Sequence, residues 1–532
     1  MSESGESAAL SGCRLTGMEH LAGSLILLTS DQYHRATQAR DPRFDGVFFI
    51  GITSTGIYCR PICPARVSVF SHRRFFVSAP AAERAGYRPC LRCRPELAPG
   101  RAPVDAVSRL AFAAALRIGA GALNGGSVAD LARELGVSER HLRRALERQL
   151  GVSPIELAQT HRLLLAKRLL ADTALPVTQV AFASGFQSLR RFNTVFRERY
   201  QLSPSKLRRG ASAGNGRRRS STQAAAGPER DVVRLTLAYR APLAWNVLLT
   251  FLERDALPGV ELVRAARYGR TVRVDGRRGV VFAADMTPSS ARPPRFTGTH
   301  LDLEVSLGLV PALMPLLARL RHLFDLDAEP VAIDAHLEQG GLASLVARRP
   351  GIRIPGAVDA FEVVLGAVIR SPRPSSSAAC EATRRVVAAL GEPLDTGVPG
   401  LDRLAPTAER VADAGAAHLR NLGVTPRRAL ALAAAARAIA EGHLTLAPGG
   451  DIVSARRALL AIDGIGDQLA TEILIRTLCW PDAFPAFDRA LQRAAGVSGP
   501  GSLRARAERW RPWRAYAALH LWLEDRERRS DR

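Results

Sequence analysis

Several features that would place a chain outside the cytosol are missing from this sequence of 532 residues. No run of about eighteen apolar residues occurs, so no membrane-spanning helix is expected. The short apolar run at residues 21–28 follows acidic residues and lacks the basic flank and small-residue cleavage site of a signal peptide. Seven cysteines in a chain of this length do not make a disulfide framework. These absences predict a cytoplasmic protein with no membrane partner.

Lysine is almost absent, occurring only as Lys167 and Lys206, yet the chain is strongly basic. Lysine and arginine together number 74 against 50 acidic residues, which gives a formal net charge of +24 that is nearly all arginine. Such an excess favours a polyanionic partner, either nucleic acid or an anionic membrane surface. The alternative is a solvated surface that is merely rich in arginine. Of these, we favour nucleic acid.

Composition and periodicity divide the chain into successive units, as its length leads one to expect. Residues 31–97 are compact and hold four cysteines, whereas residues 210–230 are of low complexity and typical of a linker. Such a linker predicts two halves that move independently. Alternating apolar and polar residues predict strands at 231–239, 271–274 and 279–283. Apolar residues recur at helical spacing over 104–209, 300–346 and most of 356–526.

The four grouped cysteines have the spacing of a metal site. Cys59 and Cys63 are separated by three residues, and Cys90 and Cys93 by two. Two short cysteine pairs on separate loops supply the four soft ligands that Zn²⁺ prefers. The remaining Cys13, Cys380 and Cys479 are scattered and are expected to be ordinary small residues. On spacing alone, the zinc site is either a structural one or a reactive one.

The residues around these cysteines carry a specific resemblance. Residues 55–66 (TGIYCRPICPAR) and 87–95 (YRPCLRCRP) resemble the N-terminal domain of Ada-type alkylation-response proteins. The resemblance implies that Cys59 accepts a methyl group from a DNA methylphosphotriester while all four cysteines hold zinc. It also implies that Thr55 and Arg66 contact the phosphate. The chemistry is reasonable, because zinc keeps a cysteine as the nucleophilic thiolate at neutral pH. Methylation would also remove one negative charge that repels DNA.

Two helix-turn-helix elements are predicted within 104–209. The first has Ala132, Gly136 and Ser138 at the spacing of a helix, a tight turn and a helix cap. The second repeats this pattern around Gly185 and Ser188. Basic residues that could hold phosphates or read bases lie on the two second helices: Arg140, Arg143, Arg144, Arg190 and Arg191. The paired elements resemble the DNA-binding domain of AraC-type activators, which implies promoter DNA and RNA polymerase as partners. A helical bundle with a solvated basic face is the alternative.

A glycine hairpin lies in the C-terminal half. Gly464 and Gly466 separate two predicted helices, an arrangement in which backbone amides can approach a phosphate. The plain alternative is an ordinary turn between helices. With Asp488 and Trp522 following, the order resembles a helix-hairpin-helix DNA glycosylase of the AlkA type. The resemblance implies that Asp488 is the catalytic carboxylate and that Phe251 and Trp522 line the pocket for an alkylated base. With no lysine at the hairpin, we expect a monofunctional enzyme without lyase chemistry.

This half departs from the family at several positions. Ser371 and Pro372 occupy the loop expected to wedge the minor groove. Gln468 replaces a pocket tryptophan, and Glu472 replaces a nearby aromatic residue. Two alternatives therefore stay open: an active glycosylase, or a catalytically impaired half that serves only DNA binding. The Pro-Cys-His-Arg motif of a guanine-methyl acceptor is absent, so that transfer is not expected.

Taken together, these patterns predict a multidomain, mostly α protein with α+β parts. We expect an alkylation-response and DNA-repair protein that binds Zn²⁺ and double-stranded DNA, acts as a monomer and is associated with the nucleoid. The expected units are an N-terminal extension (1–30), a zinc domain (31–97), a double helix-turn-helix domain (104–209), a linker (210–230), an αβ subdomain (231–350) and a helix-hairpin-helix body (351–526).

Overall fold

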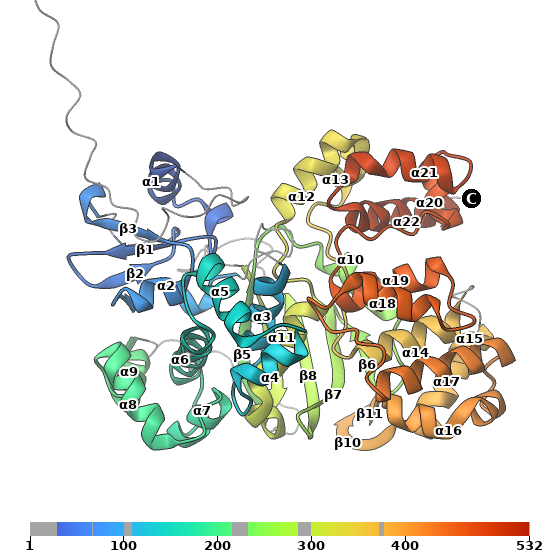
Figure 1. Ribbon diagram of the computed structural model, residues 1–532, viewed down its shortest axis with the longest axis horizontal. Coiled ribbons are helices and arrows are strands. Elements are labelled where there is room, and N and C mark those ends of the chain that lie inside the picture. The colour runs from blue at the N-terminus through green and yellow to red at the C-terminus, as the bar shows by residue number, and fades with distance from the viewer. Residues whose placement is uncertain are drawn as a thin grey trace, which may run out of the picture.

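The computed structural model describes residues 29–65, 68–99, 109–214, 232–285, 299–371 and 377–530. In Figure 1 the N-terminal strands and the C-terminal helical body lie at opposite ends of the long axis, with the other helices and a large sheet between them. The mostly helical, multidomain fold with mixed α and β parts is confirmed. Among the described residues, no helix is long and apolar enough to cross a membrane.

The N-terminal module is a four-stranded sheet in the order β3-β1-β2-β4, in which only the β2–β4 pair is parallel. Its aromatic residues form the core, because Phe49, Tyr58, Phe76 and Tyr87 pack together with α2 behind them. The elements are α1 (Ser30–Gln38), η1 (Pro42–Phe44), β1 (Phe49–Ile52), β2 (Ile57–Cys59), η2 (Phe70–His72), β3 (Arg73–Phe76), α2 (Ala79–Arg84), β4 (Arg88–Pro89) and η3 (Pro95–Leu97).

The next module is entirely helical, as predicted. Ser138 caps α5 by accepting a hydrogen bond from the backbone N–H of His141 at 3.3 Å, and Gly136 has the positive φ (+68°) that the tight turn requires. Ser188 caps α8 in the same way. The helices are α3 (Arg109–Gly119), α4 (Val128–Glu134), α5 (Glu139–Leu150), α6 (Pro154–Asp172), α7 (Val177–Ala183), α8 (Leu189–Tyr200) and α9 (Pro204–Gly214).

A five-stranded antiparallel sheet in the order β5-β9-β8-β7-β6 follows. The three predicted strand segments are confirmed within β5, β7 and β8. The prediction that helix resumes at residue 300 is wrong, because residues 299–306 form β9, whose alternating leucine and acidic residues suit a half-buried strand. The elements are β5 (Val232–Tyr239), α10 (Trp245–Arg254), β6 (Glu261–Arg264), β7 (Arg267–Val274), β8 (Arg277–Asp285), β9 (Thr299–Ser306), η4 (Leu307–Ala312), α11 (Leu313–Leu323), α12 (Pro330–Leu337), η5 (Glu338–Leu342) and α13 (Ala343–Arg348).

The C-terminal body is helical apart from a small hairpin, β10–β11, that the sequence pattern did not reveal. Its core is rich in alanine, which lets α14, α17 and α19 approach closely. The elements are α14 (Ala360–Arg370), α15 (Ser377–Leu390), β10 (Glu392–Val398), β11 (Leu401–Leu404), α16 (Ala408–Asn421), α17 (Pro426–Ala440), α18 (Ile452–Leu460), α19 (Asp467–Leu478), α20 (Arg489–Ala494), α21 (Pro500–Ala507), η6 (Glu508–Trp510) and α22 (Arg514–Ser530).

The two halves of the chain are packed together. Buried side chains of α6 and α8, such as Leu163 and Phe192, belong to the same apolar cluster as Val233 of the large sheet and Leu313 of α11. Helix α7 packs on η4, and α3 packs on α11. This packing contradicts the independent movement expected from the linker, because separating the halves would expose that cluster to water. Of the predicted linker (210–230), residues 210–214 form the end of α9, and residues 215–230 lie outside the described residues.

Candidate functional site

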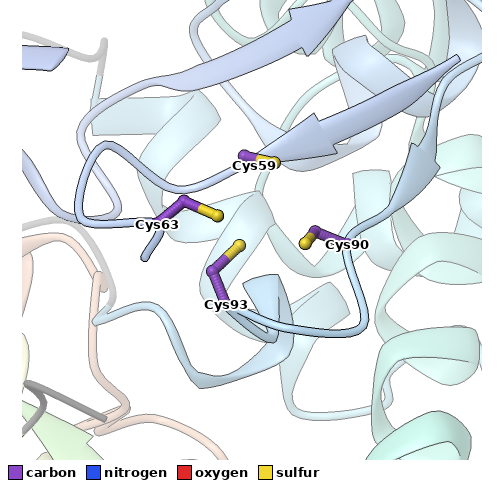
Figure 2. Close-up of side chains that lie close together, drawn as sticks. All are labelled: Cys59, Cys63, Cys90 and Cys93. Carbon is purple, nitrogen blue, oxygen red and sulfur yellow. The ribbon is translucent and has the colours of Figure 1, made fainter. Parts of the chain in front are cut away.

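The four grouped cysteines converge at one end of the N-terminal sheet (Figure 2). Cys59 ends β2, and Cys90 follows β4. Because these strands are parallel neighbours with Tyr58 opposite Pro89, both cysteines leave the sheet side by side. Cys63 and Cys93 lie on the loops that follow. Strand pairing therefore brings together two cysteine pairs that are some thirty positions apart in the sequence.

The arrangement fits a tetrathiolate metal site. All four Sγ atoms lie within 4.8 Å of one another. A tetrahedral zinc site with Zn–S distances of about 2.3 Å has S–S edges of about 3.8 Å, so only a small contraction is needed. Backbone N–H groups of Arg60 and Arg92 donate to the Sγ atoms of Cys93 and Cys90, at 3.4 and 3.3 Å. Cys90 and Cys93 are buried, whereas Cys59 and Cys63 are partly exposed, which leaves one side of the cluster open to a reactant.

Buried ion pairs tie this cluster to its surroundings. The guanidinium of Arg60 pairs with Asp45 and donates to the carbonyl of Cys93 at 3.1 Å. Lys167 of α6 donates to the carbonyl of Cys90 at 3.2 Å and pairs with Glu96 at 2.6 Å. Although burial opposes it, Lys167 and Arg94 hold the pKa of Glu96 below its usual value. Sequence reasoning missed this link, although a lone lysine within an apolar helical stretch was a signal for it.

The structure describes one of the two residues predicted to contact the phosphate. Thr55 lies in the turn before β2, whose other end carries Cys59. It lines a cavity of about 450 Å³ between the N-terminal module and helices α6 and α8, together with Arg88 and Arg199. Arg66 lies outside the described residues. The role of Thr55 as a phosphate contact stays a prediction.

The predicted DNA-reading arginines lie on the second helix of each helix-turn-helix element. Arg140, Arg143 and Arg144 on α5 are exposed, as are Arg190 and Arg191 on α8. Their opposite faces are apolar: Leu142 and Leu146 of α5 are buried, and Phe192 and Phe196 of α8 are buried. Arg143 pairs with Glu139 one turn earlier, at 2.6 Å. Both helices thus present basic faces to solvent.

In the C-terminal body, Asp488 is held rigidly at the N-terminus of α20. Its Oδ1 accepts hydrogen bonds from the backbone N–H groups of Ala490 and Leu491, at 2.7 and 3.1 Å. Its Oδ2 accepts from Trp522 Nε1 at 3.1 Å and from Gln468 Nε2 at 3.3 Å. The residue is therefore a helix cap, as expected for its position, and its second oxygen is oriented by two side chains.

A second carboxyl group lies beside Asp488. Glu472, one turn after Gln468 on α19, accepts a hydrogen bond from the same amide nitrogen at 3.0 Å. Burial raises the pKa of Glu472 to about 7; the hydrogen bond from Gln468 and the charge of Arg254 oppose this rise, and Asp488 adds to it. Two positions that depart from the family pattern are thus joined to the predicted catalytic residue.

The two residues predicted to line the base pocket, Phe251 and Trp522, share one apolar cluster. Phe251 is 4% exposed and belongs to the buried cluster against which Trp522 packs. The guanidinium of Arg254, one turn later on α10, lies 5.4 Å from the Phe251 ring centroid and pairs with Asp255 at 2.9 Å. The sequence analysis did not identify Arg254. The indication available was that it lies three residues after Phe251, which places both on the same face of a helix.

The glycine hairpin joins α18 to α19. Gly464 has φ +91°, which strains any other residue, and a Cβ there would lie 3.0 Å from Ala431 Cβ, so the neighbouring methyl group would also have to shift. Gly466 is the N-cap of α19, where backbone N–H groups are free to face an anion. Ser371 ends α14, but residues 372–376, which include Pro372 and the rest of the predicted wedge, lie outside the described residues.

Comparisons with known proteins cover all of these parts. Family models match residues 32–96 (metal binding domain of Ada), 131–210 (helix-turn-helix domain) and 234–359 (AlkA N-terminal domain). The chain is 37% identical over 497 residues to a probable bifunctional transcriptional activator/DNA repair enzyme AlkA of Mycobacterium tuberculosis, covering 92% of this chain and 96% of that one. It is 36% identical over 295 residues to DNA-3-methyladenine glycosylase 2 of Escherichia coli (54% of this chain, 97% of that one). It is 46% identical over 71 residues to the E. coli bifunctional transcriptional activator/DNA repair enzyme Ada (13% of this chain, 20% of that one).

Proposed function

Because this chain belongs to the family of bifunctional transcriptional activator/DNA repair enzymes, we propose that its three DNA-acting parts serve one response to alkylation damage. The chain is a zinc-binding DNA repair protein that combines methyl-transfer, helix-turn-helix and glycosylase domains, and its partner is DNA. Cytoplasmic, nucleoid-associated action belongs to the proposal, since damaged DNA and promoter DNA are found there.

At the cysteine cluster, Cys59 is the methyl acceptor. Its thiolate sulfur attacks the methyl carbon of a DNA methylphosphotriester, the S–C bond forms, and the C–O bond breaks. The oxygen leaves with the electron pair as an ordinary phosphodiester. Bound zinc keeps the cysteines as thiolates at neutral pH. Cys59 suits this role because it is partly exposed, whereas Cys90 and Cys93 are buried as ligands only.

The helix-turn-helix module then binds a promoter. Its two basic helices, α5 and α8, are the elements that enter the major groove, and Arg140, Arg143, Arg144, Arg190 and Arg191 make the contacts. Loss of one thiolate charge on methylation strengthens binding to the DNA backbone. We further propose that the activator contacts RNA polymerase and acts as a monomer.

In the glycosylase half, Asp488 is the catalytic carboxylate. The bond between C1′ and the alkylated base breaks, and the base leaves with the electron pair. The Asp488 carboxylate stabilises the positive charge on the sugar and accepts a proton from the water that bonds to C1′. Trp522 holds Asp488 and offers an aromatic face to a cationic base. The observation that carries this proposal is a carboxylate fixed by four donors beside that aromatic residue.

We propose a monofunctional glycosylase. Lyase chemistry of the usual kind needs a lysine amine at C1′. Both lysines of the chain lie in the helix-turn-helix module, Lys167 buried in α6 and Lys206 on α9. Neither lies near Asp488, so water is the nucleophile.

Two assays test the proposal. Purified protein incubated with alkylated duplex DNA should release free base, and no release above an Asp488→Asn control would leave the alternative, a glycosylase half that only binds DNA. The departures at Ser371, Pro372 and Gln468 favour that alternative, and the presence of Asp488 opposes it. For the zinc site, mass analysis after exposure to methylphosphotriester DNA should find the methyl group on Cys59. An unmethylated Cys59 under conditions that fully bind the DNA would point to a structural zinc site.

A further inference from the structure

At the proposed glycosylase site, one amide bridges two carboxyl groups. The amide nitrogen of Gln468 has two protons, and it donates to Glu472 Oε1 at 3.0 Å and to Asp488 Oδ2 at 3.3 Å. One amide therefore holds both groups at fixed positions on the same side of α19. Within the described part of the chain, Glu472 Oε2 accepts no hydrogen bond. That oxygen is free to interact with a base that enters beside Asp488.

The charges around Glu472 come from two further elements. Asp488 at the start of α20 repels an ionised Glu472, and Arg254 at the end of α10 attracts it. Asp255 lies next to Arg254 and adds repulsion, but Arg254 and Arg476 both pair with it, at 2.9 and 3.0 Å. Arg254 is thus already paired with Asp255, so only part of its positive charge is available to offset an ionised Glu472. Within the residues that the structure describes, Glu472 forms no ion pair, so its ionisation adds a negative charge that is not neutralised by direct pairing.

We propose that Glu472 is a specificity-determining residue of the glycosylase, which selects bases that carry a positive charge. The inference rests on the glycosylase function proposed above. Alkylation at a purine ring nitrogen gives the base a formal positive charge, whereas an undamaged base is neutral. A carboxylate beside the bound base attracts a cationic base electrostatically, whereas it has no such attraction for a neutral base. The aromatic side chain expected at this position would recognise the same charge more weakly, through its ring face.

This role differs from that of Asp488. Asp488 acts on the sugar and is needed whatever the base, whereas Glu472 acts on the charge of the base. Since burial raises the pKa of Glu472 to about 7, its carboxylate forms as the pH rises through neutrality. Preference for a cationic base should therefore increase between pH 6 and pH 8. In this proposal Glu472 binds the base and takes no part in bond breaking. Its effect is therefore measured as the ratio of the dissociation constants for a cationic and a neutral base.

The test compares two duplexes that differ by a single charge. One carries 3-methyladenine and the other its neutral isostere, 3-deaza-3-methyladenine, both on a 2′-fluoro sugar that resists hydrolysis. Fluorescence anisotropy with the full-length zinc-loaded protein gives the ratio of the two dissociation constants. At pH 8 the wild-type protein should favour the cationic base, and Glu472→Gln, which keeps shape and hydrogen bonding, should reduce that ratio about tenfold. Glu472→Asp should retain part of the preference, and Glu441→Gln, a remote exposed control on the C-cap of α17, should retain all of it.

The outcomes separate this inference from the glycosylase function. An equal ratio in wild type and Glu472→Gln overturns the inference, as does a wild-type ratio that does not change between pH 6 and pH 8. A wild-type protein that binds both duplexes equally also overturns it. Because binding is measured without hydrolysis, a failure to release base in the Asp488 assay would contradict the catalytic proposal alone. A lower ratio in Glu472→Gln, restored in part by Glu472→Asp, supports the inference in either case.

Discussion

The zinc centre and the glycosylase pocket both handle alkylated DNA, but they are constructed in opposite ways. The zinc centre takes its four cysteines from two loops at the end of one small sheet, with two and three residues between the members of each pair. The proposed glycosylase site takes Arg254, Gln468, Asp488 and Trp522 from four helices spread over about half of the chain. The first site is local and depends on its metal. The second depends on the packing of the whole C-terminal half.

The two sites also hold their reactive groups differently. Cys59 is partly exposed, and in the proposed reaction it is used once, so it needs access more than precise orientation. Asp488 is held by four hydrogen bonds, and in the proposed reaction it acts in every turnover, so it must return to one position. This contrast predicts that substitutions at one site leave the chemistry of the other intact.

Removing a zinc ligand should have the largest effect. Cys63→Ala leaves three thiolates without a full ligand set, and metal binding supplies on the order of 10 kcal/mol to the folding of small zinc domains. We expect loss of bound zinc and of methyl transfer to Cys59, with base release retained. Metal analysis and mass spectrometry measure the first two. Cys380→Ala, at an exposed cysteine on α15, is the matched control. Parallel loss of base release would show that the two sites are not independent.

Asp488→Asn should lower the rate of base excision by about 10³-fold, because it removes the charge that stabilises the sugar cation and accepts the proton. Asparagine still caps α20, so the fold should persist. Single-turnover release of alkylated base measures the rate, and methyl transfer to Cys59 is the internal control. A variant that excises at the wild-type rate would contradict the assigned role.

Lys167→Met should destabilise the contact between the zinc module and α6 by about 3 kcal/mol, since it leaves Glu96 buried without its main partner. Lys206→Met, at the other lysine of the chain and on the surface, should have little effect. Thermal unfolding of the zinc-loaded protein compares the two variants. Equal unfolding temperatures would show that the buried pair adds nothing to stability.

The same pair predicts a dependence on pH. The pKa of Glu96 is lower in the folded protein than its usual value, so its contribution to stability is present at neutral pH and is lost as the pH falls through the lowered pKa. Wild-type stability should therefore fall more steeply on acidification than that of Lys167→Met. Chemical unfolding from pH 7 to pH 3, a range that extends below the usual pKa of a glutamate, measures the slope, and parallel slopes would contradict the assignment to this pair.

Trp522→Phe should have the smallest effect, a decrease in excision rate of about tenfold. It keeps an aromatic ring but loses the Nε1–H group that orients Asp488, a hydrogen bond to a charged group that contributes on the order of 1.5 kcal/mol. Trp480→Phe, at a half-buried tryptophan beside α18, is the control. A drop for Trp522→Phe as large as that for Asp488→Asn would mean that the indole does more than orient the carboxylate.

Local features of the fold followed from the sequence. The capping serine Ser138, the turn glycine Gly136 and the alternating residues of β5 were predictable, because each reflects the conformational preference of a few neighbouring residues. Strand β9 was missed because its alternating residues run directly into a helical stretch. The docking of the two halves was also missed. The sequence shows that α7 and η4 each have an apolar face that must be covered. It does not show which segment of the chain covers that face.

By itself, the sequence determined the zinc centre, because a ligand set within short loops is fixed by chain connectivity and by the thiolate preference of the metal. It also supplied the prediction that Asp488 is the catalytic carboxylate, through the order of the motifs around it. Only the tertiary structure decided that Lys167 joins the zinc module to α6, and that Gln468 joins Glu472 to Asp488. The physical reason is that burial and partner choice set the charge of these groups, and both depend on which distant segments pack together.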